Sequence, residues 1–593
     1  MANLFASFNA GVSGLHSAQT SMNTTAHNLS NATTSGYSRQ QVMVTDARYT
    51  TRYGAYSNRM QIGLGTNVAQ IRQVRNNFLD DQYRLQVGRL GFYEAQYEAV
   101  QELEELFGEM EGEEFLTSAT NMWGAMQGLA ETPDDIACRT EFVSMAVQFV
   151  ERAQVLQDQL KEYQKNMNQE VKRQVDEIND IVSEIGNYNV LIRKYEAAGE
   201  EANDYRDSRN LLLDRLGSII QFETNEEVDG TISIYAEGQF LLEANVQFRL
   251  TTEYESETSK LLKPVWETGG DFFLRGELSY SSENDTDTGS LRGLLVARGT
   301  ESTDYTYLPT KPVKEDYVDE DGVLNERAYL NATKNYEKEV EAYNENIEPS
   351  VVMKVLAEFD QLVHGIVTMI NDTFCPNKEI ELADGTKMTV LDTENAPVGD
   401  DAEHTIGTEL FVRRNTERYT PVEVTIRNAD GSTEDVTVYR YNEEDESDKY
   451  TLYTIEQMEV NPDLLRNPSM LPLNANPESG FVDGFTQNIC KEMLEKWGQD
   501  FATLDPNSMT TYDFMGYYGA LVGQFAVDGN VWKGIVENQN ITVNAVESER
   551  QNVMGVSSDE ELADLIKFQK CFDASSRYIT VVDEMIEHLI TSL

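Results

Sequence analysis

Histidine and cysteine most often hold metal ions or attack substrates, and both residues are scarce in this chain. Only five histidines and four cysteines occur in 593 residues. The histidines form no H-E-x-x-H pair, and the sequence contains no C-x-x-C motif. Neither a zinc site nor a disulfide scaffold is therefore encoded. We expect free or buried thiols at Cys138, Cys375, Cys490 and Cys571.

Patterns typical of other active sites are also missing. There is no G-x-S-x-G motif, and Gly63-Leu64-Gly65 is too short for a dinucleotide loop, so we interpret it as a turn between extended segments. His16 and His27 are expected to be packing or surface residues. Among 102 Asp and Glu residues some close pairs are inevitable, so no glycosidase-like pair can be singled out. We assign no catalytic, cofactor-binding or metal-binding residue and expect a protein that is not an enzyme.

The charge balance restricts the possible partners. Lys and Arg number 47 against 102 Asp and Glu, which gives a formal net charge of −55. This charge repels both a phosphate backbone and an anionic lipid surface, so nucleic acid and membranes are poor partners. No run of 18 apolar residues is present, and no membrane insertion is expected. The amino terminus lacks a basic start followed by an apolar stretch, so we expect any export to proceed without a cleaved signal peptide.

The amino-terminal segment has no charged side chains with which to form ion pairs: its first 38 residues contain no Asp, Glu, Lys or Arg. Its large apolar residues recur every seven positions, and a second row of mostly small residues (Leu4, Gly11, Ala18 and Thr25) lies beside them. Two adjacent rows at this spacing are typical of a coiled-coil seam. Because a helical glycine costs about 1 kcal/mol relative to alanine, this helix should need a partner. The large-residue row consists of Phe8, Leu15, Met22 and Leu29.

The carboxyl-terminal segment carries a matching pattern. Ser557 or Ser558, followed by Glu560 and Glu561, predicts a capped helix start with acidic residues in its first turn. A single amphipathic helix at a chain end usually packs on its own domain, but matched seams at both ends favour mutual or intermolecular pairing. The two carboxyl-terminal rows are Leu565, Phe572, Ile579 and Ile586, and Phe568, Ser575, Val582 and Leu589.

The central region alternates between two kinds of pattern. Apolar residues at a spacing of three or four predict a long helix from about 137 to 197 and further helices after Val352 and Phe514. Alternating β-branched and aromatic residues after residues 230 and 421 predict β modules, while 301–347 is polar and strongly charged. We predict a mainly α fold with terminal coiled-coil helices, a discontinuous helical-bundle rod and inserted β-rich domains, a multidomain α+β protein.

This interpretation divides the chain into five units. They are a terminal coiled-coil assembly domain (1–75 with 550–593), a helical rod domain (76–220 with 348–374 and 500–549), an inserted β-rich domain (221–300), a polar surface insertion (301–347) and a second β-rich outer domain (375–499).

The end of the first predicted helix resembles the signature shared by flagellar axial proteins. In that signature a heptad helix ends at an Asn-x-x-Asn element followed by Gly-Tyr and a basic residue, and the matching string here is GLHSAQTSMNTTAHNLSNATTSGYSRQ. Asparagine and glycine are residues that end a helix and turn the chain, and a tyrosine can anchor such a turn. The string GVSSDEELADLIKFQKCFDASSRYITVVDEMIEHLI resembles the matching carboxyl-terminal motif. The corresponding amino-terminal positions are Asn28, Asn31, Gly36, Tyr37 and Arg39.

Three further strings favour one member of this class. GYSRQ after the first helix, NDYRDSRNLLLDRLGSII at 203–220 and TGSLRGLLVARG at 288–299 resemble the hook-associated protein 1 family of the hook-filament junction. The resemblance implies a structural subunit that polymerises through its terminal helices, in contact with hook protein and the next hook-associated protein. It also implies an extracellular position in the flagellum and export through the flagellar secretion apparatus.

The same resemblance implies an export chaperone bound at the carboxyl-terminal helix and a ring or helical homo-oligomer. Two alternatives stay open: the hook protein itself, which the long central rod argues against, and an acidic extracellular carbohydrate-binding protein or enzyme. The residues expected to form the assembly seam are Phe8, Leu15, Met22, Leu29, Leu565, Phe568, Phe572, Ile579, Val582, Ile586 and Leu589.

Overall fold

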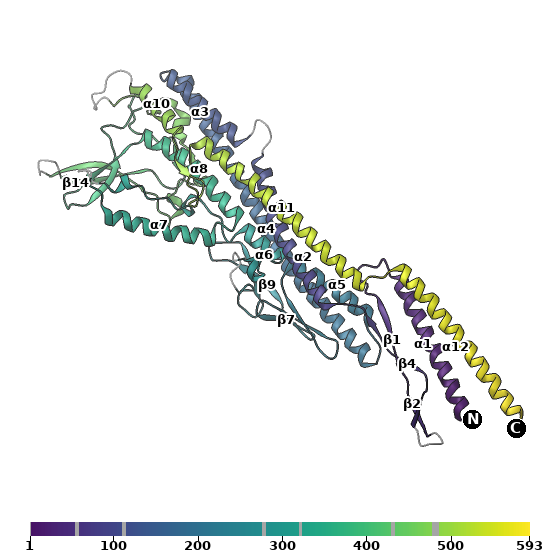
Figure 1. The fold of residues 1–593 in the computed structure, drawn as a ribbon. Coiled ribbons are helices and arrows are strands. Elements are labelled where there is room, and N and C mark those ends of the chain that lie inside the picture. Colours follow the sequence, from purple (N-terminus) through teal and green to yellow (C-terminus); the bar gives the residue numbers. More distant parts are fainter. Residues whose placement is uncertain are drawn as a thin grey trace.

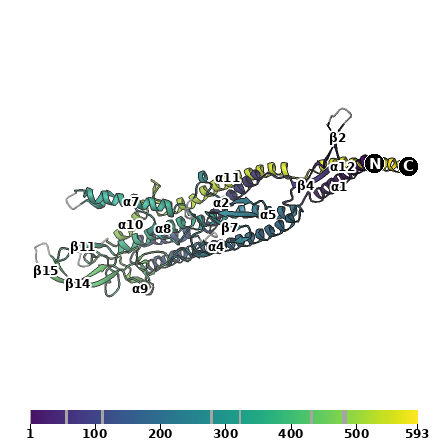
Figure 2. The same cartoon turned by 90° about the horizontal axis from the view of Figure 1, so that it is seen from below.

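Long helices run along an elongated molecule with both chain termini at one end (Figures 1 and 2). The strands between residues 40 and 73 lie near that end, and the strands around residue 425 lie at the other. The computed structural model describes residues 2–592 except 54–58, 109–113, 275–279, 319–322, 428–432 and 477–484. The predicted fold class, a helical rod with inserted β regions, is confirmed. The α-helices in this described part are α1 (Ala2–Ser30), α2 (Asn77–Phe107), α3 (Phe115–Glu131), α4 (Ile136–Ala197), α5 (Asn203–Ile219), α6 (Ser290–Arg298), α7 (Glu326–Asn346), α8 (Val351–Phe374), α9 (Pro462–Arg466), α10 (Phe485–Trp497), α11 (Phe514–Met554) and α12 (Ser558–Ser592).

Helix α4 is the backbone of the rod. Its 62 residues would span about 90 Å, and the predicted helix at about 137–197 is confirmed. The helix starts where the Asp135 side chain accepts a hydrogen bond from the Ala137 N–H, which satisfies one of the free donors of the first turn. Its apolar residues are buried at a spacing of three and four against α3, α5 and the β strands, so one stripe of α4 holds the rod together.

Helices α2 and α11 form the second long pair of the rod and lie side by side in both views. Helix α11 continues to Met554, so the domain boundary expected at residue 550 falls within its last turn. A short connection then leads into α12, which begins at Ser558. Ser557 stands directly before it, and the Glu560 N–H donates to Ser557 Oγ at 3.5 Å.

The sheets are small and antiparallel. The strands predicted after residues 230 and 421 are confirmed, in four-stranded sheets ordered β5-β6-β7-β8 and β11-β12-β15-β14. Their bounds, with those of the two-stranded sheets, are β1 (Gln40–Asp46), β2 (Tyr49–Tyr53), β3 (Arg59–Gly63), β4 (Thr66–Gln73), β5 (Glu223–Glu226), β6 (Ile232–Ala236), β7 (Gln239–Glu243), β8 (Val246–Gln247), β9 (Leu250–Tyr254), β10 (Leu262–Trp266), β11 (Asn377–Glu381), β12 (Lys387–Leu391), β13 (Phe411–Arg413), β14 (Tyr419–Arg427), β15 (Thr433–Tyr441), β16 (Met458–Val460), β17 (Ala502–Thr503) and β18 (Thr511–Tyr512).

One apolar core continues from the rod into both β regions. The Phe115 ring lies 5.0 Å from that of Phe359, and Phe149 of α4 lies 6.3 Å from Phe411 of β13, measured between ring centroids. These contacts join α3, α4, α8 and the outer strands in a single buried cluster. The β regions are therefore fixed to the rod by packing. The expectation for the cysteines also holds, since all four are free and Cys375 and Cys490 are buried.

Candidate functional site at the paired terminal helices

Helices α1 and α12, from opposite ends of the chain, lie side by side beyond the end of the rod (Figures 1 and 2). Glycines on α1 allow the two helices to approach closely. A Cβ added at Gly11 would lie 2.8 Å from Ile579 Cγ1, and one at Gly14 would lie 3.0 Å from Ser575 Oγ. The glycines that weaken α1 as an isolated helix are thus those against which α12 packs.

The predicted seam residues of α12 share the face that meets α1. Val582 is buried, and the side chains of the others are half-buried. On α1 the arrangement is different, because the small residues Gly11, Ala18 and Thr25 are buried. The large-residue row of α1 lies beside that line of contact and stays half-buried. The half-buried seam residues are Phe8, Leu15, Met22, Leu29, Leu565, Phe568, Phe572, Ile579, Ile586 and Leu589.

A second face of α1 packs on the β1–β4 hairpin. Ser17 Oγ lies 3.1 Å from Thr66 Oγ1, and the Thr66 N–H donates to Ser13 Oγ at 3.1 Å. Gly65 adopts φ +115° directly above α1, where an added Cβ would lie 2.1 Å from Ser13 Oγ. The hydroxyl residues of α1 therefore hold the hairpin. The segment Gly63-Leu64-Gly65 links β3 to β4 in extended form and is not the turn expected from the sequence; Gly65 makes this approach possible because it has no side chain.

The helix-stop residues converge on one buried carboxylate. The Asn28 side chain, 1% exposed, donates from Nδ2 to Glu561 Oε2 at 3.1 Å and to the Gln40 carbonyl at 2.9 Å. Arg39 Nε lies 2.7 Å from Glu561 Oε1, and the Arg39 N–H donates to the Met554 carbonyl at 2.8 Å. The end of α1, the strand that follows it and the start of α12 are therefore joined at Glu561, which we call the Glu561 hub.

Tyr37 completes the hub. Its hydroxyl donates to Asn28 Oδ1 at 2.8 Å, so the His27 Nδ1, 3.0 Å from that hydroxyl, is the donor to Tyr37. Burial raises the pKa of Tyr37 well above its usual range, which keeps this donor protonated. Gly36, at φ +77°, turns the chain toward Tyr37, and Asn31 closes the helix end by donating to the His27 carbonyl at 3.0 Å.

A network of buried charges connects this terminal unit to the rod. Asp207 of α5 accepts hydrogen bonds from the Ser38 N–H (3.2 Å) and from Gln73 Nε2 (2.8 Å). Burial is the main cause that raises the pKa of Asp207 to about 6. Arg550 of α11 contacts Asp214 of α5 at 2.7 Å and stacks over the Tyr83 ring of α2 at 4.0 Å. Asp207 of α5 therefore contacts the segment that follows α1, and Arg550 holds the rod helices α2, α5 and α11 together at the joint.

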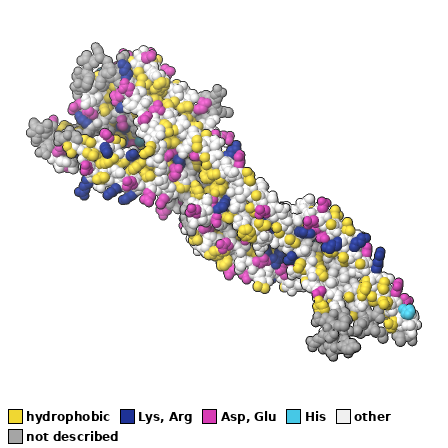
Figure 3. All heavy atoms as spheres, viewed as in Figure 1, with side chains coloured by type: hydrophobic (Ala, Val, Ile, Leu, Met, Phe, Trp, Pro, Cys, Tyr) yellow, Lys and Arg dark blue, Asp and Glu magenta, His cyan; other side chains and the backbone are white. Residues whose placement is uncertain are grey.

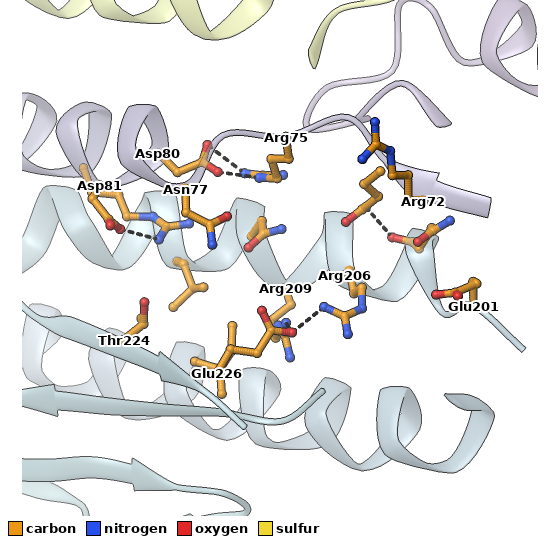
Figure 4. A pocket seen from close by; sticks show the side chains of 16 residues that line it. Arg72, Arg75, Asn77, Asp80, Asp81, Glu201, Arg206, Arg209, Thr224 and Glu226 are labelled. Carbon is orange, nitrogen blue, oxygen red and sulfur yellow. Dashed lines mark hydrogen bonds and ion pairs between the residues drawn. The ribbon is translucent and has the colours of Figure 1, made fainter. Parts of the chain in front are cut away.

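A cavity of about 380 Å³ lies at the same joint (Figure 4). Arginines from the end of β4 and from α5 line it, and each of three has an acidic partner. Arg75 Nε contacts Asp80 at 2.6 Å, Arg206 Nε contacts Glu196 at 2.7 Å, and Arg209 lies 3.5 Å from Glu226. Figure 4 shows Arg75 directed at Asp80 and Arg206 directed at Glu226. We therefore interpret the ion pairs that line the cavity as contacts that hold the terminal unit in position relative to the rod.

Sequence reasoning did not predict which residues pair at the Glu561 hub or at the joint between the terminal helices and the rod. Glu561 was recognised only as a first-turn acidic residue, although it lies 522 positions from Arg39, its ion-pair partner. Asp207, Arg209 and Asp214 all belong to the string NDYRDSRNLLLDRLGSII, whose buried charges are unusual for a helix. That concentration of charge within a helical pattern was the available signal.

The surface of the terminal pair is apolar in places. Figure 3 shows hydrophobic side chains among the charges at this end of the molecule. Several apolar residues of α12 are exposed: Leu562, Ile566, Val581, Met585 and Ile590. Across the residues that the structure describes, no group of three or more His, Cys, Asp or Glu side chains is arranged to hold a metal ion. No helix in that part of the chain is long and apolar enough to cross a membrane.

Comparison with known proteins places matches on both the rod and the terminal pair. Residues 100–314 match the helical domain of the flagellar hook-associated protein FlgK family. Residues 548–592, which include α12, match the carboxyl-terminal family of the flagellar basal body rod FlgEFG proteins.

Relatives cover the whole chain. Flagellar hook-associated protein 1 of Bacillus subtilis is 21% identical over 100% of this chain and 99% of the relative. The Escherichia coli protein of the same name is 22% identical over 98% of each chain. The solved flagellar hook junction protein FlgK from Burkholderia pseudomallei aligns with a TM-score of 0.49 at 12% identity, over 80% of this chain and 100% of that chain.

The two chain ends pair beside a helical rod, and flagellar families match both the rod and the terminal pair. Together these findings define an axial structural protein of the bacterial flagellum. Within that class, the relatives that match the whole chain share one name. The chain is similar to flagellar hook-associated protein 1 over its whole length.

Proposed function

We propose that this chain is the structural subunit that joins hook to filament and that it polymerises through α1 and α12. The observation that carries the proposal is the pairing of the two chain ends outside the rod core, fixed by the Glu561 hub. A unit held beside the rod in this way presents both terminal helices to neighbouring subunits. Its work is mechanical, with no catalytic step.

The role of the seam follows from its incomplete burial. Ile579 lies against Gly11 of α1 and is half-buried, as is Phe572 one heptad earlier, whereas Val581 and Met585 are exposed. Apolar side chains of this kind gain free energy when a neighbouring subunit covers them. We therefore propose that the seam residues hold each α1–α12 pair together and that the exposed apolar residues of α12 form contacts between subunits.

The remaining assignments are also proposals. The five-domain division given above, with the terminal unit as the assembly domain, agrees with the separation of α1 and α12 from the rod. The partners would be further copies of this chain in a ring or helix, hook protein and the next hook-associated protein. An export chaperone would bind α12, whose exposed apolar residues need covering before assembly.

The alternatives are less well supported. A hook protein would share the terminal helices, but the similarity to hook-associated proteins extends over the entire chain. An acidic carbohydrate-binding protein or enzyme would need a site in the β regions, and their strands pack into the core shared with the rod.

Immunogold labelling of isolated flagella tests the proposal. With antibodies against this chain, gold should be confined to the boundary between hook and filament. Gold along the whole hook, or over the cell wall, would contradict it.

A further inference from the structure

Helix α7 is attached to the molecule mainly at its carboxyl-terminal end. Of the residues of α7, all of which the structure describes, Tyr343 is the one that is buried. It belongs to a small apolar cluster with Leu308, Ile347, Met353 and Ala357 that is separate from the main core. Two hydrogen bonds to the 505–508 turn support it: Tyr336 Oη donates to the Pro506 carbonyl at 3.3 Å, and Asn507 Nδ2 donates to Asn344 Oδ1 at 2.8 Å.

Buried polar atoms are concentrated below this attachment. Among the described residues, Glu358 Oε1 is buried without a hydrogen-bond partner, and Glu348 Oε2 and Tyr343 Oη are buried beside it. Glu358, on α8, is 1% exposed. A buried carboxylate that lacks a partner is costly, whereas a protonated carboxyl carries no charge to desolvate.

The charges around Glu358 favour the protonated form. Lys354, one turn earlier on α8, is the nearby cation, and its ammonium contacts Glu348 at 3.1 Å. Glu348 after α7, Asp505 of the turn and Asp528 of α11 all place negative charge toward Glu358. The hydroxyls of Tyr343 from α7 and Tyr517 from α11 also face it. Burial is the main cause that raises the pKa of Glu358 well above its usual range.

We propose that the Glu358 carboxyl is a proton-dependent latch that holds α7 against the rod, and that loss of its proton to solvent releases α7. An ionised Glu358 would place a second carboxylate beside the Lys354–Glu348 pair, directly below Tyr343. Water must then enter to solvate it, and we infer that it enters through the small cluster that anchors α7, because Tyr343 of that cluster faces Glu358. Because the folded-state pKa of Glu358 is raised, docking is complete at low pH and is lost as pH rises through that pKa.

Hydrogen exchange of the full-length purified chain, followed by mass spectrometry from about pH 6 to about pH 10 and corrected for intrinsic rates, tests this latch. Protection of α7 should fall about tenfold or more across this range, while α4 stays protected. Glu358→Gln should keep α7 docked at every pH. An unchanged α7 in the wild-type chain, or a pH dependence that persists in Glu358→Gln, would overturn the proposal.

Two further variants separate Glu358 from its neighbours. Lys354→Met removes the nearby cation and should move the midpoint of α7 release to higher pH; an unchanged or lower midpoint would count against the latch. Burial raises the pKa of Asp360, which lies two positions further along α8, to about 7. Asp360→Asn should leave the pH dependence of α7 in place. If it abolishes that dependence instead, Asp360 and not Glu358 is the titrating group. If Glu358→Gln also loses the protection of α4, the variant has lost the rod fold and does not test the latch. The pH midpoint of α7 release in Lys354→Met is then the deciding measurement.

Discussion

Asn28 and Glu561 lie 533 positions apart in the chain, yet Asn28 Nδ2 donates to Glu561 Oε2 at 3.1 Å in a buried site. Both side chains are at most 2% exposed, so water cannot replace the contact if it is broken. The same carboxylate accepts from Arg39, and the same asparagine accepts from Tyr37 and from the Gln40 N–H. The relationship between these two residues therefore decides how firmly the terminal helices are joined.

Glu561→Gln should loosen the terminal pair while leaving the rod intact. Glutamine keeps the shape of the side chain but removes the charge that holds Arg39, which should cost about 1.5–3 kcal/mol in the local opening of α1 and α12. Hydrogen exchange of these helices measures the effect. Glu560→Gln is the matched control, because the Glu560 side chain is 67% exposed and its contact with Arg39 is longer, at 3.4 Å. Equal exchange in both variants would contradict the role assigned to the hub.

Phe572→Asp or Ile579→Asp should block assembly. Either change places a carboxylate in the α1–α12 seam, where its desolvation should cost about 2–5 kcal/mol. The expected phenotype is an exported soluble variant, hooks without filaments and filament protein shed into the medium, with thermal unfolding of the rod unchanged. Electron microscopy and analysis of the medium measure this outcome.

The control for this seam experiment is Asp573→Ser, because Asp573 is exposed beside the seam. Export is assayed separately, since the proposed chaperone would bind the same helix. An exported Phe572→Asp protein that still carries normal filaments would remove α12 from the assembly mechanism.

Asp207 should make the stability of the joint fall as pH rises through its raised pKa. Its pKa is raised from 3.8 to about 6, mainly by burial. Its stabilising contribution is therefore complete below about pH 4 and falls as pH rises to about 6, because the unfolded chain releases its proton first. A change in pKa of this size corresponds to at most about 3 kcal/mol. Urea unfolding of Asp207→Asn and wild type between these pH values should show a flatter pH dependence in the variant.

Asp204→Asn provides the comparison for this titration, since Asp204 lies one turn away at the exposed start of α5. A slope that Asp204→Asn changes as much as Asp207→Asn does would show that the buried carboxyl is not its source.

The polar insertion should be removable only in part. Tyr305 donates its N–H to Asp360 at 3.1 Å, and Leu308 and Tyr343 belong to one apolar cluster. Replacing residues 310–340 by a short Gly-Ser linker keeps these anchors, and filament attachment and rod stability should survive. Electron microscopy of flagella and thermal unfolding check both. Loss of filaments with a stable rod would show that the insertion is part of an assembly surface.

The sequence predicted the features that repeat. The heptad spacing of Phe572, Ile579 and Ile586 is visible in the sequence alone, and so is the stripe of α4, because helical geometry imposes a regular period. The row of α1 that meets α12 could not be predicted from the spacing. That choice depends on the space a Cβ at Gly11 would need beside Ile579, which only the packed pair defines.

The polar contacts were beyond prediction for a different reason. Asn28, Asn31 and Gly36 carry a local helix-stop signal, but nothing local links Asn28 to Glu561 or Ser38 to Asp207. Each of these contacts has a sequence separation of more than 150 positions. They form because the rod brings the two chain ends to the same place, so they depend on the whole fold.

That dependence sets an order for folding. Closing a loop of 533 residues costs about 5–6 kcal/mol in chain entropy, which the few contacts of the Glu561 hub do not repay alone. Once α2 and α11 have paired, Asp80 lies beside Arg550, and most of that loop is closed. The terminal pair should thus be the last part of the chain to fold and the first to open. In a chain that emerges amino end first, α1 therefore has no helix to pair with until α12, the final helix, has emerged.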